Sequence, residues 1–192
     1  MAVNLAVLAS GRGSNFKSIL QAIEAGDLDS SVKILVTDRG NAGALRIAEE
    51  YDVNSKYIPY DRDNRRAFEE QAGDLIEENE CDLIVMAGYM RVLTPYFIRR
   101  FENRILNIHP SLLPAFKGLH AQRQALEYGV KISGCTVHIA SEDMDSGPII
   151  AQRAVPVFDD DTEESLSERI LGEEHKLYPI AIREYAEKLE LI

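Results

Sequence analysis

Residues 106–119 read LNIHPSLLPAFKGL, a short apolar strand, expected over residues 104–108, that runs into a loop containing two prolines. Side chains alternate between the faces of a strand, so Asn107 and His109 are expected on one face and their apolar neighbours on the other. An amide beside an imidazole suits attack on a carbonyl, because charge develops on oxygen and a leaving nitrogen needs a proton. The spacing equally allows a buried strand end whose two polar side chains bind the backbone of the loop.

Strand and helix patterns alternate upstream of this stretch. Strands are expected over residues 4–9, 32–37, 56–59 and 83–87, and helices over residues 15–25, 42–51, 63–78 and 94–101. This order implies a parallel sheet covered by helices. Residues 83–87 are continuously apolar, which is typical of a strand buried on both faces.

The pattern changes downstream of residue 118. A short helix is expected over residues 122–128, two strands over 133–139 and 149–155 joined by an acidic turn, and a terminal helix over 162–189 interrupted near Gly172 or Pro179. No low-complexity linker separates the halves, so they are expected to share one sheet. The sequence therefore predicts one α/β domain over residues 1–192: an open, mostly parallel sheet covered by helices on both faces, with late antiparallel strand pairing.

Composition narrows the class of protein. A chain of 192 residues that is 45% hydrophobic can bury one core, and 21 basic against 32 acidic residues give a net charge of -11. Nucleic acid needs a positive field, so no nucleic-acid partner is expected. The start lacks a basic signal-peptide region and no apolar run reaches the ~20 residues of a membrane helix, so we expect a cytoplasmic protein without a membrane partner. Cys81 and Cys135 lack ligand spacing, so reduced thiols and no metal are expected.

Residues 10–15, SGRGSN, lie at the first expected strand-to-helix turn. Anions bind at such turns because glycines let the backbone approach and the N–H groups of the helix start point outward, while Ser14 or Asn15 could cap the helix. A dinucleotide loop is a less favoured alternative, because Phe16 occupies the third glycine position of that fingerprint. A plain tight turn with a capped helix is the third interpretation.

Three further features are ambiguous by pattern alone. Residues 88–93, GYMRVL, could line a pocket or simply lead a strand into a helix. Arg65 and Arg66 open a helix, where the dipole disfavours cations, which hints at a bound anion. Residues 141–148, SEDMDSGP, form an acidic turn of the kind that is usually solvated, and His138 is expected to be a structural, hydrogen-bonding histidine.

Three blocks in order, SGRGSN at 10–15, LNIHPSLLPAFKG at 106–118 and EDMDSGPIIAQ at 142–152, resemble the folate-dependent formyltransferases. The likeness runs from about residue 4 to residue 179. It implies a Rossmann-like formyltransferase fold with a nucleotide-binding half, about residues 1–100, and a folate-binding and catalytic half, about residues 101–192. It also implies transfer of a formyl group from 10-formyltetrahydrofolate to the amine of glycinamide ribonucleotide in de novo purine biosynthesis.

The same resemblance assigns site residues. Asn107 and protonated His109 are expected to stabilise the oxygen of the tetrahedral intermediate, and Asp145 to keep His109 charged. The residues implied for the ribonucleotide are Gly13, Ser14, Asn15, Met90 and Glu174. Those implied for the folate are Arg65, Met90, Arg91, Val92, Leu93 and Asn107, with recognition of the pteridine ring largely through backbone groups.

Other functions remain open at this point. A formyltetrahydrofolate hydrolase shares the Asn-His-Asp core but usually carries an extra N-terminal domain. A transferase acting on initiator methionyl-tRNA needs a basic C-terminal domain, whereas this sequence ends in EKLELI. A non-catalytic nucleotide-binding module would account only for the glycines. For the favoured interpretation we expect small-molecule partners and a monomer or weak homodimer.

Overall fold

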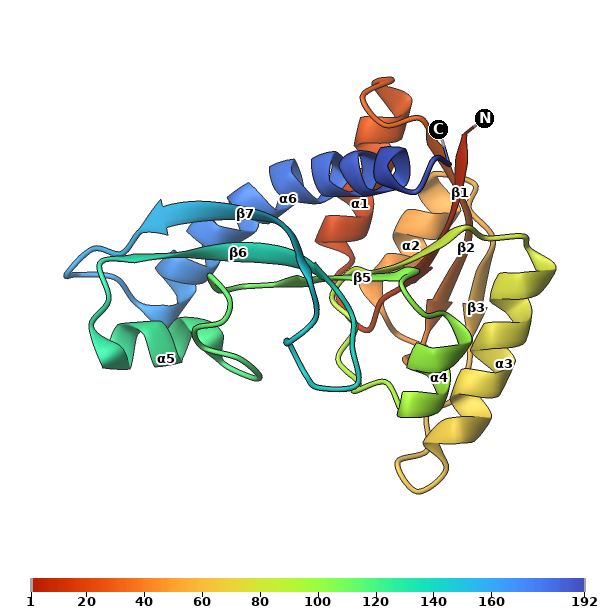
Figure 1. Cartoon of the computed structure of the whole chain (residues 1–192), viewed down its shortest axis with the longest axis horizontal. Helices are drawn as coiled ribbons and strands as arrows, with labels where there is room; N and C mark the ends of the chain where they lie inside the picture. The colour runs from red at the N-terminus through yellow and green to blue at the C-terminus, as the bar shows by residue number, and fades with distance from the viewer. Residues whose placement is uncertain (1, 192) are drawn as a thin grey trace.

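A computed structural model describes residues 2–191 (Figure 1), and within that range seven strands form one sheet in the order β3-β2-β1-β4-β5-β6-β7. The parallel strands are β1 (Val3–Leu8), β2 (Ser30–Thr37), β3 (Ser55–Tyr57), β4 (Leu83–Met86) and β5 (Ile105–His109). The strands β6 (Ile132–Ile139) and β7 (Ile149–Pro156) add on by antiparallel pairing. The predicted mostly parallel sheet with late antiparallel strand pairing is confirmed, and both halves of the chain contribute strands to it.

Helices cover both faces of the sheet. On one face lie α1 (Ser14–Glu24), α2 (Gly43–Glu50) and α6 (Glu163–Lys188), with α5 (Ala121–Tyr128) packed against α6. On the other face lie α3 (Arg65–Glu78) and α4 (Pro95–Arg100). A hydrophobic core lies on each face of the sheet, and successive side chains of β4 alternate between the two cores. Leu83 and Val85 pack on the α1 side, and Ile84 packs on the α3 side. Burial on both faces explains why this strand is apolar without interruption.

The terminal helix differs from its predicted form. Residues 163–188 form one uninterrupted α-helix, although Pro179 lies inside it, so the expected break near Gly172 or Pro179 was wrong. An internal proline removes a helical hydrogen bond and costs ~3 kcal/mol. Packing of the apolar helix face offsets this cost, and the buried Tyr178 also donates its hydroxyl to the carbonyl oxygens of Met86 and Leu106 at 3.1 and 3.0 Å.

Neighbouring strand ends bring three loops together. The chain leaves β1 into residues 9–13, β4 into residues 87–94, and β5 into residues 110–120. The connection between β6 and β7, residues 140–148, returns beside β5, because Asn107 pairs with His138 in the β5–β6 ladder. In Figure 1, α3 and α4 lie to the right of this junction and β6, β7 and α5 to its left. Ligands of open α/β sheets bind at the carboxyl ends of strands, which is where these loops meet.

Candidate active site

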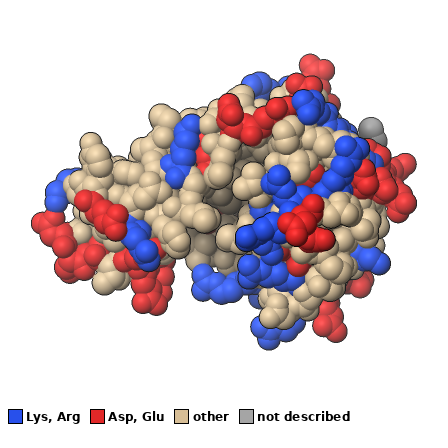
Figure 2. All heavy atoms as spheres, turned by 90° about the horizontal axis from the view of Figure 1, so that it is seen from below, with Lys and Arg blue, Asp and Glu red and all other residues tan. Residues whose placement is uncertain are grey.

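A pocket of about 440 Å³ opens where these loops meet. Figure 2 shows a hollow between the two parts of the molecule, with lysine and arginine side chains gathered along one side of it. The pocket is lined by residues of the strand ends and loops, with both polar and apolar side chains: Met86, Gly88–Leu93, Ile98, Asn107–Pro110, Gly118–His120, Gln122, His138, Ala140–Glu142, Met144, Asp145 and Glu163. Its volume is typical of a site for a small organic ligand.

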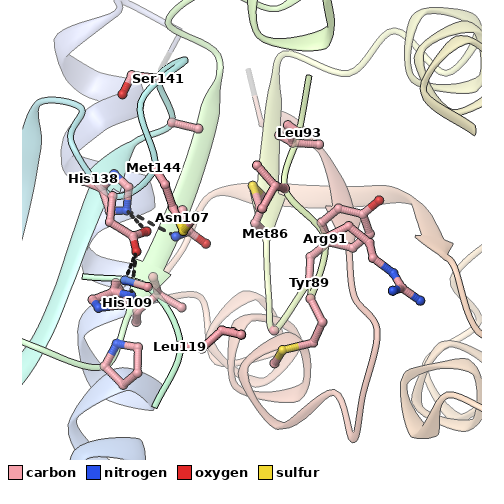
Figure 3. A pocket seen from close by; sticks show the side chains of 18 of the residues that line it. Met86, Tyr89, Arg91, Leu93, Asn107, His109, Leu119, His138, Ser141 and Met144 are labelled. Atoms are coloured by element: carbon pink, nitrogen blue, oxygen red, sulfur yellow. Dashed lines mark hydrogen bonds and ion pairs between the residues drawn. The ribbon is translucent and has the colours of Figure 1, made fainter. Parts of the chain in front are cut away.

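The three residues expected to act together do meet in this pocket. Asn107 and His109 project into the pocket from β5 (Figure 3). The loop between β6 and β7 brings Asp145 to the same pocket. The Nδ1 atom of His109 lies 3.4 Å from Oδ2 of Asp145. The predicted alternation holds, since Leu106 and Ile108 belong to the core on the α1 side. Their catalytic roles remain predictions.

His109 is buried, and both of its ring nitrogens face hydrogen-bond acceptors. Its Nε2 lies 2.8 Å from the carbonyl oxygen of Phe116, and a carbonyl can only accept, so Nε2 is the donor. Its Nδ1 faces the carboxylate of Asp145. Each ring nitrogen thus has an acceptor in front of it, so an imidazolium form of the ring would find a partner at both positions.

Asp145 is held as a carboxylate. Burial alone would raise its pKa, but contact with His138, the N–H of Gly118 and the charge of His109 together lower the pKa to about 2. The Gly118 N–H donates to Oδ2 at 2.8 Å. The side chain is 9% exposed, so little water screens these interactions. Asp145 therefore presents a negative charge to two imidazoles at neutral pH.

His138 contacts other polar residues of the pocket, which the sequence did not predict. As expected, it makes a structural hydrogen bond, donating from Nδ1 to the carbonyl oxygen of Ile139 at 3.0 Å. Its Nε2, however, points into the pocket, 3.2 Å from the amide nitrogen of Asn107 and 3.7 Å from Oδ1 of Asp145. His138 thus orients the amide of Asn107. The signal that could have found it is strand register, because His138 is the antiparallel partner of Asn107.

Two loops, residues 110–120 and 140–148, hold this cluster, and we call them the catalytic loops. Phe116, His120 and Asp145 have φ angles of 53°, 58° and 50°, a region that non-glycine residues rarely adopt. The loops are joined by the Gly118–Asp145 bond and by Lys117, whose ammonium donates to the hydroxyl of Ser146 at 2.6 Å. Cross-loop bonds of this kind keep an unfavourable backbone in place.

Residues 88–94, the wall loop, form the opposite side of the pocket. The side chain of Arg91 turns away from it, as Figure 3 shows, to bind the buried Asp38 at 2.6 Å and to stack 4.4 Å from the ring centre of Tyr60. The guanidinium of Arg91 therefore points away from the cavity, and main-chain recognition of a ligand by this loop stays a prediction. Arg65 lies outside the lining, exposed at the start of α3, so a folate contact there stays a prediction.

Residues 10–15, the glycine loop, contain two glycines in different surroundings. Gly13 has a φ of +81°, and a Cβ added to it would lie 2.8 Å from the Cα of Ala44 in α2. Glycine is therefore required there by helix packing. A Cβ added to Gly11 would meet nothing within 4 Å, so its open side is free for a ligand. The start of α1 has no side-chain cap, which leaves its first N–H groups available to an anion.

The expected capping by Ser14 or Asn15 was wrong, because Asn15 is used elsewhere. Its amide nitrogen donates to the carboxyl of Glu174 in α6 at 2.8 Å, and both side chains are buried. Burial raises the pKa of Glu174, and the bond from Asn15 partly opposes this shift. Two residues implied for the ribonucleotide are thus in direct contact, 159 positions apart in the sequence.

Other chemistries find little support within residues 2–191. No group of three or more His, Cys, Asp or Glu side chains in this range could hold a metal ion. Burial raises the pKa of Cys81 to about 11 and of Cys135 to about 12, so neither is an activated nucleophile. Among the described helices, none is both long enough and apolar enough to cross a membrane.

An open α/β sheet with a carboxylate, two imidazoles and an amide in a pocket at its strand ends is the arrangement of an enzyme active site. Known proteins agree with this class, since the model of a family described as formyl transferase matches residues 3–182. The chain belongs to this formyl transferase family.

Individual relatives cover nearly the whole chain. A phosphoribosylglycinamide formyltransferase from Bacillus subtilis is 42% identical over 180 residues, 93% of this chain and 92% of its own. The crystal structure of glycinamide ribonucleotide transformylase 1 from Symbiobacterium toebii is 45% identical, with a TM-score of 0.93 over 97% of this chain and 89% of that one. A formyltetrahydrofolate deformylase from Pseudomonas syringae pv. tomato is 26% identical, with a TM-score of 0.92 over 98% of this chain and 62% of that one.

Proposed function

We propose that this enzyme transfers a formyl group from 10-formyltetrahydrofolate to the amine of glycinamide ribonucleotide, a step of de novo purine biosynthesis. Relatives named phosphoribosylglycinamide formyltransferase and glycinamide ribonucleotide transformylase match this chain over nearly their full length. The single observation that carries the proposal is the cluster of Asn107, His109 and Asp145 beside a pocket of about 440 Å³. We take the folate as a co-substrate that brings the formyl group and assign no metal to the reaction.

The amine attacks the formyl carbon, and a new C–N bond forms as the carbonyl oxygen becomes an oxyanion. Asn107 and protonated His109 donate to this oxygen, and the low exposure of the cluster strengthens those bonds. Collapse of the intermediate breaks the bond from carbon to the folate nitrogen. That nitrogen gains a proton and the amine loses one, so His109, or a water beside it, relays the proton without net consumption.

Asp145 and the catalytic loops prepare His109 for this task. The carboxylate stabilises the imidazolium, and Asp145 itself stays ionised at neutral pH because its pKa, about 2, lies far below neutrality. The Nε2 of His109 already donates to the carbonyl oxygen of Phe116. To donate to the oxyanion of the intermediate instead, Nε2 gives up its hydrogen bond to Phe116. The exchange requires a shift at Phe116, whose φ of 53° is unfavourable for a phenylalanine.

Each substrate has its own part of the site in this proposal. The phosphate of the ribonucleotide binds the uncapped start of α1 at Gly13, Ser14 and Asn15, and Glu174 binds the ribose. The pteridine ring lies against the backbone of the wall loop, where Met90 and Val92 are 60% and 51% exposed at the rim. We further propose a cytoplasmic enzyme, consistent with its two free, buried cysteines, that exists as a monomer or weak homodimer.

A formyltetrahydrofolate hydrolase is the second candidate, favoured by the likeness to the deformylase. The two functions separate in one assay, in which tetrahydrofolate release from 10-formyltetrahydrofolate is followed with and without glycinamide ribonucleotide. The proposed transferase releases tetrahydrofolate only when the ribonucleotide is present. Equal release in its absence would identify a hydrolase, and no release in either case would leave a binding module.

A further inference from the structure

Ser10 stands between the two substrate subsites. It follows β1, is 1% exposed and begins the glycine loop. Its backbone N–H donates to the carbonyl oxygen of Gly88 at 3.1 Å, and its hydroxyl oxygen accepts the N–H of Met90 at 2.8 Å. A single buried residue of the glycine loop therefore holds two points of the wall loop.

The hydroxyl is needed because regular strand pairing stops at this point. The ladder of β1 and β4 ends at Leu8 and Met86, and two further backbone bonds extend it as far as Gly88. Gly88 has a φ of +74°, which turns the wall loop out of the sheet. The next N–H that faces β1, from Met90, is taken by the Ser10 side chain in place of a backbone carbonyl. The Ser10 hydroxyl thus holds the backbone of Met90 inside the wall loop.

The other anchors of the wall loop come from elsewhere. Arg91 is held by Asp38 after β2, and Thr94 is held by the buried Glu69 of α3, through a backbone bond of 2.7 Å and a second bond from its hydroxyl. Neither carboxylate belongs to the glycine loop. Among these anchors, Ser10 belongs to the glycine loop and contacts the wall loop directly.

We propose that Ser10 is a positioning residue that couples the two substrates, so that ribonucleotide bound at the glycine loop raises the affinity for folate. This inference rests on the proposed function for its two ligands. Phosphate binding fixes the glycine loop, which fixes the Ser10 hydroxyl and with it Met90 and the wall loop. Coupling of binding is reciprocal, so folate raises the affinity for ribonucleotide by the same factor.

The test is isothermal titration of a folate analogue that cannot donate its formyl group, with and without saturating glycinamide ribonucleotide. In the wild-type enzyme the ribonucleotide should tighten folate binding by about fivefold or more. In Ser10→Ala each ligand should still bind alone, but the enhancement should fall below twofold. The reverse titration, ribonucleotide with and without the analogue, should give the same factors, because coupling of binding is reciprocal.

Ser18→Ala is the matched control. Its hydroxyl donates to the carbonyl of Asn15 inside α1 at 2.8 Å and does not contact the wall loop, so this variant should keep the wild-type enhancement. If Ser10→Ala does not fold, Ser10→Cys fills the same space with a weaker acceptor and should show the same loss. An absent enhancement in the wild type, or one retained in Ser10→Ala, overturns the coupling. A wild type that binds no ribonucleotide at all would instead overturn the proposed function.

Discussion

The glycine loop and the catalytic loops reach unusual backbone conformations by different means. In the glycine loop, positive φ falls on Gly13, and the neighbouring helix α2 leaves no room for a side chain there. In the catalytic loops it falls on Gly118 and also on three non-glycine residues, Phe116, His120 and Asp145; hydrogen bonds between side chains and backbone hold Phe116 and Asp145. A site for a phosphate needs only exposed N–H groups, whereas a proton-transfer site needs side chains, so the second type of loop cannot be made of glycine alone.

The strongest test of the catalytic loops is Asp145→Asn. Asparagine tolerates positive φ and keeps the size of the side chain, so the loop should survive while its charge is lost. Loss of a preorganised electrostatic partner commonly costs ~10²-fold or more in turnover. We expect such a fall in kcat with near-normal ribonucleotide binding, measured by steady-state kinetics and titration.

Asp143→Asn is the control for this variant, because Asp143 is exposed in the same loop and lies outside the pocket lining. It should leave kcat unchanged. Full activity in Asp145→Asn would show that the charge of Asp145 is not needed for catalysis.

Acid stability should also distinguish Asp145 from a solvated aspartate. Its folded pKa, about 2, lies below the ordinary value of 3.8, so its ionised form adds stability that is present above about pH 4 and lost as pH falls towards 2. The contribution is roughly 2 kcal/mol. The free energy of unfolding of wild type minus that of Asp145→Asn should therefore shrink by about that amount between pH 6 and pH 2, as measured by denaturant titration. A difference that stays constant over this range would contradict the charged contacts of Asp145.

The glycine loop is tested by comparing its two glycines. Gly11→Val places its side chain in open space and should weaken ribonucleotide binding about tenfold, because it obstructs charged hydrogen bonds to the phosphate, while folding is kept. Gly13→Val should lower the thermal midpoint instead, because it collides with Ala44 and demands a strained φ. Calorimetry of folding and titration of both ligands measure the two effects. If a folded Gly11→Val protein lost affinity equally for both ligands, the assignment of the phosphate to this loop would be wrong.

The smallest effect is expected at the wall loop. Val92 is 51% exposed at the rim of the pocket, so Val92→Ala should cost folate binding only the lost apolar contact, about 1 kcal/mol. A proline at this position removes an N–H and should weaken binding far more. Similar affinities of a folate analogue for the two variants would contradict main-chain recognition.

The sheet and the polar pair on β5 were predictable because they depend on local periodicity. Alternation placed Asn107 and His109 together, and the apolar run at Leu83–Met86 indicated a central strand. Asp145 was assigned by family resemblance, since an acidic turn by itself indicates only solvent.

The features that sequence missed depend on partners far away in the chain. His138 lies in the site because it pairs with Asn107 across the β5–β6 ladder. Asn15 does not cap α1, because its amide binds Glu174 in the last helix. Pro179 continues a helix because tertiary packing outweighs a local preference. Phe116 adopts a positive φ although phenylalanine is not a residue type that indicates this conformation in a sequence. None of these could be read from neighbouring residues alone.

The outward turn of Arg91 has a consequence for inhibitors and for resistance to them. A competitor that occupies the proposed pteridine subsite would meet main-chain atoms of the wall loop, which side-chain substitutions leave in place as long as the Arg91–Asp38 anchor is kept. Point mutations that replace the contacting side chains would therefore give little escape. Escape would require changes that displace the loop itself, at Asp38 or Glu69, and those changes would also displace the natural folate.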